Sequence, residues 1–218
     1  LPERLAAYAQ AHQAWLVHYS TDYVYPGEGT QAWQEGDATK PLSVYGQSKL
    51  EGDIAIQNSG AQHLIFRTSW VYAARGHNFM RTMLKLAQER EQLDVVADQV
   101  GSPTPARLIA NVSALALHQT LTQPDSELAG VYHLVAKGYT SWYDFAQAIF
   151  KLARDSGIEL TLPADGCQPI PSSAYPTPAQ RPLNSRLSVS KLEKRFALQL
   201  PSWQASLQQT WQELQASV

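Results

Sequence analysis

The clearest pattern along the chain is an alternation of short apolar runs with longer stretches in which apolar residues recur at helical spacing. The runs Ala14–Tyr19 and Gln62–Arg67 lack alternating polar positions, which is typical of parallel strands covered on both faces. Helices are predicted over Leu1–His12 and Ser43–Asn58, the second with a Ser cap before it and Ser59-Gly60 after it. This order predicts an α/β fold with a parallel, Rossmann-like sheet.

The same alternation continues to about residue 129 and then changes. The remaining predicted elements are a helix from His77 to Glu91, a strand over Leu93–Ala97, a helix from Leu108 to Leu121, a strand over Val131–Val135, a helix from Ser141 to Ser156, a Pro-rich stretch from Pro163 to Pro182 and two short C-terminal helices. We therefore expect a dinucleotide-binding and catalytic domain over 1–129 and a smaller α+β substrate-binding lobe over 130–218, and leave interleaving of the two open. In the last helix, Trp203, Leu207, Trp211 and Leu214 share one face, which predicts a core stripe.

Candidate chemistry gathers where the first buried run ends. Thr21 and Asp22 follow that run directly, and Tyr45 and Lys49 lie one turn apart at the start of the next helix. A carbonyl that accepts hydride needs an acid beside its oxygen, and a nearby cation makes a Tyr a better acid near neutral pH. Tyr45 is the candidate acid, Lys49 the cation, and Thr21 a further hydrogen-bond donor to the carbonyl oxygen. Because α/β proteins bind ligands at the carboxyl ends of their strands, we expect these residues to meet in one crevice.

Composition narrows the choice of partners and location. With 17 Lys and Arg against 19 Asp and Glu, and no long run of one sign, the chain has no electrostatic footprint for nucleic acid. No apolar run is long enough to span a bilayer, and the N-terminal residues do not form a targeting signal. Its single cysteine, Cys167, predicts a reducing compartment, so the cytoplasm is the expected location. The six histidines have no metal-ligand spacing, and we predict structural roles for them and no metal site.

Several motifs occur together in the order and spacing of one family. They are Ser20–Tyr25 (STDYVY), Tyr45-x-x-x-Lys49, Arg67–Tyr72 (RTSWVY), Gly76–Phe79 (GHNF), Asp98-Gln99, Gly101–Pro105 (GSPTP) and Arg181–Ser185 (RPLNS). Tyr-x-x-x-Lys alone arises readily by chance, whereas the set covers nearly all of the chain. The chain resembles the dTDP-4-dehydrorhamnose reductase family of extended short-chain dehydrogenases/reductases.

The resemblance implies reduction of the 4-keto group of dTDP-4-dehydro-6-deoxy-L-mannose to dTDP-L-rhamnose with NADPH or NADH, in the synthesis of bacterial surface polysaccharides. It implies that Tyr45 donates the proton, that Tyr45 and Lys49 also contact the cofactor, and that Thr21, Asp22 and Trp70 contact the dTDP-sugar. The motifs that resemble the family's substrate-side loops contain Asn78, Gln99, Thr104 and Arg181. We assign none of these four residues an individual role. The resemblance also implies that Mg²⁺ can bind as an accessory ion, and we assign no residue of this sequence as its ligand.

Two departures from the family pattern affect these expectations. Tyr25-Pro26-Gly27 stands where the family usually has Phe-Asp-Gly, and we expect the catalytic residues to be unaffected. The strand, glycine-rich turn and helix with which such reductases begin are not in the sequence, so we interpret the chain as a truncated form, inactive alone and a poor binder of cofactor. The apolar sheet edge that this would leave favours pairing with a second copy as a homodimer.

Other readings stay open beside the reductase. Gly27–Ala32 fits G-x-G-x-x-A formally, but no helix or βαβ unit follows it, so we read it as a loop. The regulatory β-subunit of methionine adenosyltransferase resembles the same family, which makes a non-catalytic role an alternative. Another sugar-nucleotide reductase, epimerase or dehydratase is a third, because Asp22-Tyr23 follows Thr21 where a dehydratase would place an acid/base pair.

Overall fold

The structure, a computed structural model, describes residues 1–123, 127–177 and 179–216. Its helices are α1 (Pro2–Ala11), η1 (Asp22–Val24), α2 (Val44–Asn58), α3 (Phe79–Glu89), α4 (Ala106–Thr122), α5 (Trp142–Asp155), η2 (Ser172–Ala174), α6 (Ser190–Phe196) and α7 (Trp203–Gln215). Its strands are β1 (Leu16–Thr21), β2 (His63–Thr68), β3 (Val71–Tyr72), β4 (Leu93–Val96), β5 (Val100–Gly101), β6 (Thr104–Pro105), β7 (Gly130–His133), β8 (Thr140–Ser141), β9 (Cys167–Ile170) and β10 (Asn184–Ser185).

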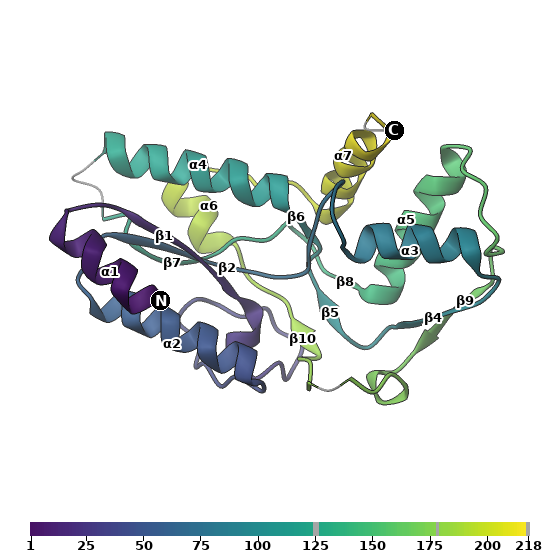
Figure 1. The fold of residues 1–218 in the computed structure, drawn as a ribbon, viewed down its shortest axis with the longest axis horizontal. Helices are drawn as coiled ribbons and strands as arrows, with labels where there is room; N and C mark the ends of the chain where they lie inside the picture. The colour runs from purple at the N-terminus through teal and green to yellow at the C-terminus, as the bar shows by residue number, and fades with distance from the viewer. Residues whose placement is uncertain (124–126, 178, 217–218) are drawn as a thin grey trace.

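A parallel sheet with the strand order β1-β2-β7 forms the centre of the first lobe. Helices α1 and α2 lie on one side of it and α4 and α6 on the other (Figure 1). Successive side chains of β2 pack against the helices on opposite faces of the sheet. Ile65 packs with Ala6 and Ile56, and Leu64 and Phe66 pack with residues of α4 and α6. The continuous apolar sequence of β2 thus reflects burial on both faces, and the predicted α/β class is confirmed.

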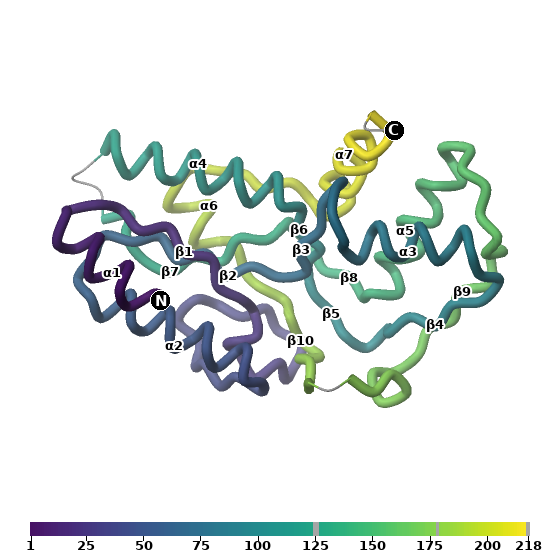
Figure 2. Tube along the Cα trace, viewed as in Figure 1, coloured from purple at the N-terminus to yellow at the C-terminus, as the bar shows by residue number. Residues whose placement is uncertain are grey.

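The second lobe has its own core. Helices α3 and α5 pack against α7 and the parallel pair β4-β9 in one apolar cluster. Trp203, Leu207, Trp211 and Leu214 of α7 are all buried, which confirms the predicted stripe. Figure 2 shows the short strands β3, β5, β6, β8 and β10 between the lobes, where the chain passes repeatedly from one lobe to the other.

The two lobes interleave, which the sequence left open. Strand β4, within residues 1–129, pairs with β9 of the second lobe, and β7, within residues 130–218, completes the main sheet beside β2. Strand pairing joins segments far apart in sequence, and a local apolar pattern does not specify the partner. Both lobes therefore draw on both halves of the chain.

The Gly27–Ala32 segment is a loop, as predicted. It precedes no helix, and Gly27 adopts φ +70° against Pro182. The Asn184 amide holds the loop by donating to the carbonyl oxygens of Glu28 and Gln31, at 3.1 and 2.8 Å. Among the described residues, the helices include none that is both long and apolar enough to cross a membrane.

Candidate active site at the end of strand β1

Strand β1 ends at Thr21, whose side chain organises the turn that follows. The Thr21 hydroxyl accepts a hydrogen bond from the Tyr23 backbone N–H at 3.2 Å and donates one to the Asp22 carboxylate at 3.0 Å. This caps η1 and turns the chain away from the sheet. Thr21 and Asp22 are both buried, at 6% and 3% exposure. The predicted pair thus lies at the carboxyl end of a central parallel strand.

Burial has a clear consequence for Asp22. Desolvation raises the pKa of its carboxyl to about 6, against opposing hydrogen bonds from Ser185 and Thr21. A carboxyl whose pKa is higher in the folded than in the unfolded chain binds more protons when folded. It therefore lowers stability above about pH 6 and ceases to do so below about pH 4.

We predict that Asp22→Asn raises the free energy of unfolding near pH 7.5. The pKa rises from 3.8 to about 6, which bounds the gain at about 3 kcal/mol. The advantage over the wild type shrinks between pH 6 and 4, where Asp22 protonates in the folded wild type. Urea unfolding of both proteins across this range checks the sign, and an advantage that grows towards acid pH would contradict it.

Tyr45 and Lys49 come to this point from the start of α2. Ser43 caps the helix by accepting from the Gly46 N–H at 3.2 Å, which fixes where the helix begins. Tyr45 is 54% exposed, and its ring meets the Tyr23 ring edge-on at 5.8 Å between centroids. The Lys49 ammonium donates to the Tyr19 carbonyl oxygen of β1 at 2.5 Å. Helix α2 is thereby held against the end of β1.

Gly46 allows the close approach of α2 to the turn after β1. A Cβ at this position would lie 2.3 Å from the Tyr23 carbonyl oxygen and 3.0 Å from Pro41 Cβ. The first of these distances is far below van der Waals contact with a backbone atom. A side chain here must push Tyr45 away from η1.

We therefore predict that Gly46→Ala lowers kcat/KM at least tenfold and lowers Tm by several degrees, as expected for overpacking against backbone. Steady-state kinetics and a thermal scan measure both effects. Gly36→Ala is the control, because a Cβ at Gly36 meets no atom within 4 Å. Equal behaviour of the two variants would contradict the role given to Gly46.

Trp70 lies farther from these residues, between β2 and β3. Its backbone has φ +50°, an unfavourable conformation for a bulky residue, and its ring stacks on Trp142 at 3.6 Å between centroids. Gly101 makes room for the Trp70 ring, since a Cβ there would lie 2.7 Å from it. The Trp142 indole N–H donates to the Gln99 side-chain oxygen at 3.2 Å. We did not single out Trp142 from the sequence, where it lies at the start of the helix predicted from Ser141 to Ser156.

Trp142, the partner of Trp70 in this stack, lines a cavity of about 770 Å³ in the second lobe, of a size that suits a small-molecule ligand. Its polar and aromatic lining includes Asn78, Gln99, Trp142, Tyr175 and Arg181. Arg181 connects the cavity to the end of β1, because its charge acts on Tyr23, opposing the rise in the Tyr23 pKa that burial causes. The charge of Arg181 thus links the cavity electrostatically to the turn that follows β1.

Some residues of the family-like motifs have structural partners. The Asn78 side chain caps α3 and donates to the carbonyl oxygens of Ala73, Arg75 and Gly76. Thr104 is fully buried and bonds the Ser102 carbonyl and the Ala136 N–H. Gln99 joins Trp142 to Ser172, and exposed Arg181 faces the cavity. Gln99 and Arg181 are therefore the members of this group best placed to meet a ligand.

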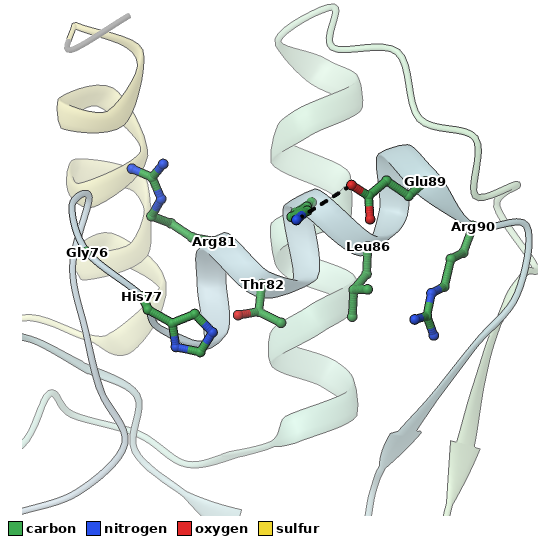
Figure 3. Close-up of a pocket in the computed structure, with 8 residues that line it drawn as sticks. Gly76, His77, Arg81, Thr82, Leu86, Glu89 and Arg90 are labelled. Carbon is green, nitrogen blue, oxygen red and sulfur yellow. Dashed lines mark ion pairs between the residues drawn. The ribbon is translucent and has the colours of Figure 1, made fainter.

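A second hollow of about 610 Å³ adjoins α3 and shares His77, Thr82, Leu86 and Arg90 with the larger cavity. Figure 3 shows Arg81 pointing to a different side of α3 from Leu86. Lys85 forms an ion pair with Glu89 along the helix, at 3.8 Å. Arg81 donates to the Ala74 carbonyl. The basic side chains here thus support the helix and its preceding loop. Within the part of the chain that the structure describes, no three His, Cys, Asp or Glu side chains cluster in a way that suits a metal ion.

Comparison with known proteins is consistent with this geometry. The family described as the RmlD substrate binding domain matches residues 1–216. The dTDP-4-dehydrorhamnose reductase of Escherichia coli K12 is 52% identical over 212 residues, which are 97% of this chain and 70% of that protein.

Solved structures resemble the chain over most of its length. A dTDP-4-dehydrorhamnose reductase from Bacillus anthracis, crystallised with NADP, superposes with a TM-score of 0.86 at 32% identity over 97% of this chain and 70% of its own. A dTDP-glucose 4,6-dehydratase from Streptomyces venezuelae reaches 0.75 at 17% identity over 99% of this chain and 64% of its own, which shows a shared fold alone. By its sequence over nearly the whole length and by its fold, the chain belongs to the dTDP-4-dehydrorhamnose reductase family.

Proposed function

We propose that the protein reduces the 4-keto group of dTDP-4-dehydro-6-deoxy-L-mannose to give dTDP-L-rhamnose, with NADPH or NADH as reductant. The observation that carries this proposal is the convergence of Thr21, Tyr45 and Lys49 around the carboxyl end of β1. These side chains supply a hydroxyl donor, an exposed phenol and an ammonium group within two turns of one helix and the end of one strand. Reduction of a carbonyl needs a proton donor beside its oxygen, and this set of side chains supplies one together with groups that stabilise the developing charge.

Tyr45 is the proton donor in this proposal. It is more than half exposed beside the end of β1, so its hydroxyl is open to a ligand in the crevice. As the carbonyl oxygen gains negative charge, the phenol hydrogen bond strengthens and the proton passes to that oxygen. The positive charge of Lys49, one helical turn away, favours the phenolate that remains.

Thr21 holds the substrate oxygen in line with Tyr45. In the structure its hydroxyl proton points to Asp22, and rotation about the Cβ–Oγ bond turns it towards a ligand. A donor aimed at a developing alkoxide stabilises it in the transition state. Asp22 then keeps its hydrogen bonds from the η1 backbone and faces the sugar.

Lys49 has the donors that a nicotinamide cofactor requires. An ammonium group has three N–H donors, and two are directed at the Tyr19 carbonyl and at His18, so the third is available to a ribose hydroxyl. The bound cofactor supplies the reducing equivalent for the carbonyl carbon. For Mg²⁺ no set of the described residues fits, and no step depends on it.

The dTDP part of the substrate fits the 770 Å³ cavity. Arg181 lines this cavity and offers a guanidinium to phosphate oxygens, which a planar fork of donors suits well. The Trp70–Trp142 stack and Tyr175 add aromatic surface for the sugar and base. A substrate seated in this way would place its sugar towards Thr21 and Tyr45.

The test is consumption of NADPH by the full-length protein with the 4-keto substrate, and identification of the product by NMR. We expect stoichiometric conversion to dTDP-L-rhamnose, and no consumption with dTDP-glucose, which lacks the keto group. Binding of both ligands without turnover would instead indicate a non-catalytic relative. The proposal places the reaction in the cytoplasm, because nucleotide sugars and reduced nicotinamide cofactors occur in that compartment.

A further inference from the structure

A chain of polar side chains runs inward from Lys49 to the buried Asp53. The Lys49 Nζ lies 3.5 Å from His18 Nε2, and that nitrogen lies 3.7 Å from Asp53 Oδ1. The other Asp53 oxygen accepts from the Ser20 hydroxyl at 2.9 Å and from Arg67 Nε at 3.2 Å. Asp53 is fully buried and His18 is partly buried, with side-chain exposures of 0% and 17%. The reductase proposal assigns no role to His18 or Asp53.

The contact with Lys49 requires one form of His18. A lysine ammonium only donates hydrogen bonds, so a hydrogen bond from Lys49 to His18 Nε2 needs a neutral imidazole with its proton on Nδ1. Burial lowers the His18 pKa, and the Lys49 charge lowers it further, against the attraction of Asp53. His18 is therefore neutral near pH 7 and able to accept.

The residues packed around His18 restrict the position of its imidazole ring. Gly52, on the same face of α2 as Lys49, has no side chain, and a Cβ there would lie 3.7 Å from His18 Nε2 and 3.1 Å from Pro2 Cγ of α1. On β2 the paired residue is Ile65. Lys49 and Asp53 are thus the ionisable groups that act on His18, since Pro2, Gly52 and Ile65 carry no charge.

We propose that His18, held between β1 and α2 beside the buried Asp53–Arg67 pair, is a positioning residue that fixes the Lys49 ammonium next to the Tyr19 carbonyl. This inference rests on the reductase function, because Lys49 matters for catalysis only there. Two fixed acceptors direct two of the Lys49 donors, which leaves the ammonium in one place relative to Tyr45. A flexible four-carbon side chain would otherwise sample many positions.

The kinetic test compares His18→Leu with His18→Gln in the full-length protein. His18→Leu removes the acceptor, so we expect kcat to fall ten- to a hundredfold and the pH profile of kcat to shift, with a smaller change in the KM for the dTDP-sugar. His18→Gln restores an acceptor oxygen near the position of Nε2, and we expect it to recover most of the loss. His63→Leu, on the neighbouring strand, is the control and should behave like the wild type.

A second readout does not depend on turnover. The rate at which acetic anhydride acylates Lys49, relative to the exposed Lys194, is measured by mass spectrometry across pH. We expect Lys49 to react at least threefold faster in His18→Leu than in the wild type, and His63→Leu to cause no change.

The two readouts separate the possible failures. Unchanged acylation of Lys49 in His18→Leu overturns the positioning role, whether or not the protein is a reductase. Altered acylation in a protein without turnover supports the positioning role and overturns the reductase function. Normal kcat in His18→Leu, in a protein that Tyr45→Phe inactivates, also overturns the positioning role and leaves the function standing.

Discussion

Tyr45→Phe is expected to lower kcat for the 4-keto sugar by about 10²- to 10⁴-fold, the range that general acid catalysis contributes. The change removes one hydroxyl and keeps the ring, so the edge contact with Tyr23 remains. Because Tyr45 is more than half exposed, the fold should not depend on its hydroxyl. The KM values for substrate and cofactor are expected to change much less than kcat. Steady-state kinetics with both ligands varied measures the difference.

The matched control is Tyr8→Phe, which removes a hydroxyl from another exposed tyrosine, 63% exposed on α1. It should retain full activity. If Tyr45→Phe keeps more than half of the wild-type kcat, then Tyr45 is not the proton donor, and Thr21 or water must supply the proton. A large rise in KM with unchanged kcat would likewise reassign Tyr45 to binding.

Arg67→Leu is expected to have the largest effect on stability, lowering the free energy of unfolding by about 3–5 kcal/mol. Arg67 donates from Nε to Asp53 at 3.2 Å and from Nη1 to the Tyr25 hydroxyl at 2.8 Å. Its removal leaves the fully buried Asp53 carboxylate with the Ser20 hydroxyl and without its cation. It also removes one hydrogen-bond partner of the Tyr25 hydroxyl. Another is His133, whose Nε2 lies 2.7 Å from that hydroxyl. Urea unfolding measures the change.

The double variant Arg67→Leu/Asp53→Leu tests the cause. If the loss arises from an uncompensated buried charge, removal of both groups should restore much of the stability. Lys151→Ala breaks the exposed Lys151–Asp155 pair and should cost less than about 1 kcal/mol. A double variant as unstable as Arg67→Leu would instead show that the loss comes from packing and from the bond to Tyr25.

Local signals in the sequence explain which elements were predicted well. Ser43 caps α2 and Gly60, with φ +75°, follows its end, so both boundaries could be read from nearby residues. The sheets to which β4 and β7 belong could not be read in this way, because they depend on pairing with β9 and β2, which lie far away along the chain. The apolar runs of these strands look alike, and only tertiary packing distinguishes them.

The candidate site shows the same division. Thr21, Asp22, Tyr45 and Lys49 follow a strand and begin a helix, which is a pattern visible in the sequence, and the structure brings them to the same end of β1. His18 and Asp53 gave no such signal, since His18 stands within an apolar run and Asp53 among the mixed polar and apolar residues of a helix. Their meeting depends on the register of α2 against β1, which a single sequence does not reveal. The same holds for the stacking of Trp142 on Trp70.

The most direct measurement locates the deuterium that the full-length protein transfers to the sugar from NADPH deuterated at nicotinamide C4. NMR of the sugar product gives the position of the label. The account predicts one deuterium at C4 of dTDP-L-rhamnose, loss of this product in Tyr45→Phe, and no solvent deuterium elsewhere on the ring. Deuterium that enters the sugar from solvent without consumption of NADPH would indicate an epimerase or dehydratase. That result would contradict reduction at C4 as the function of the site at the end of β1.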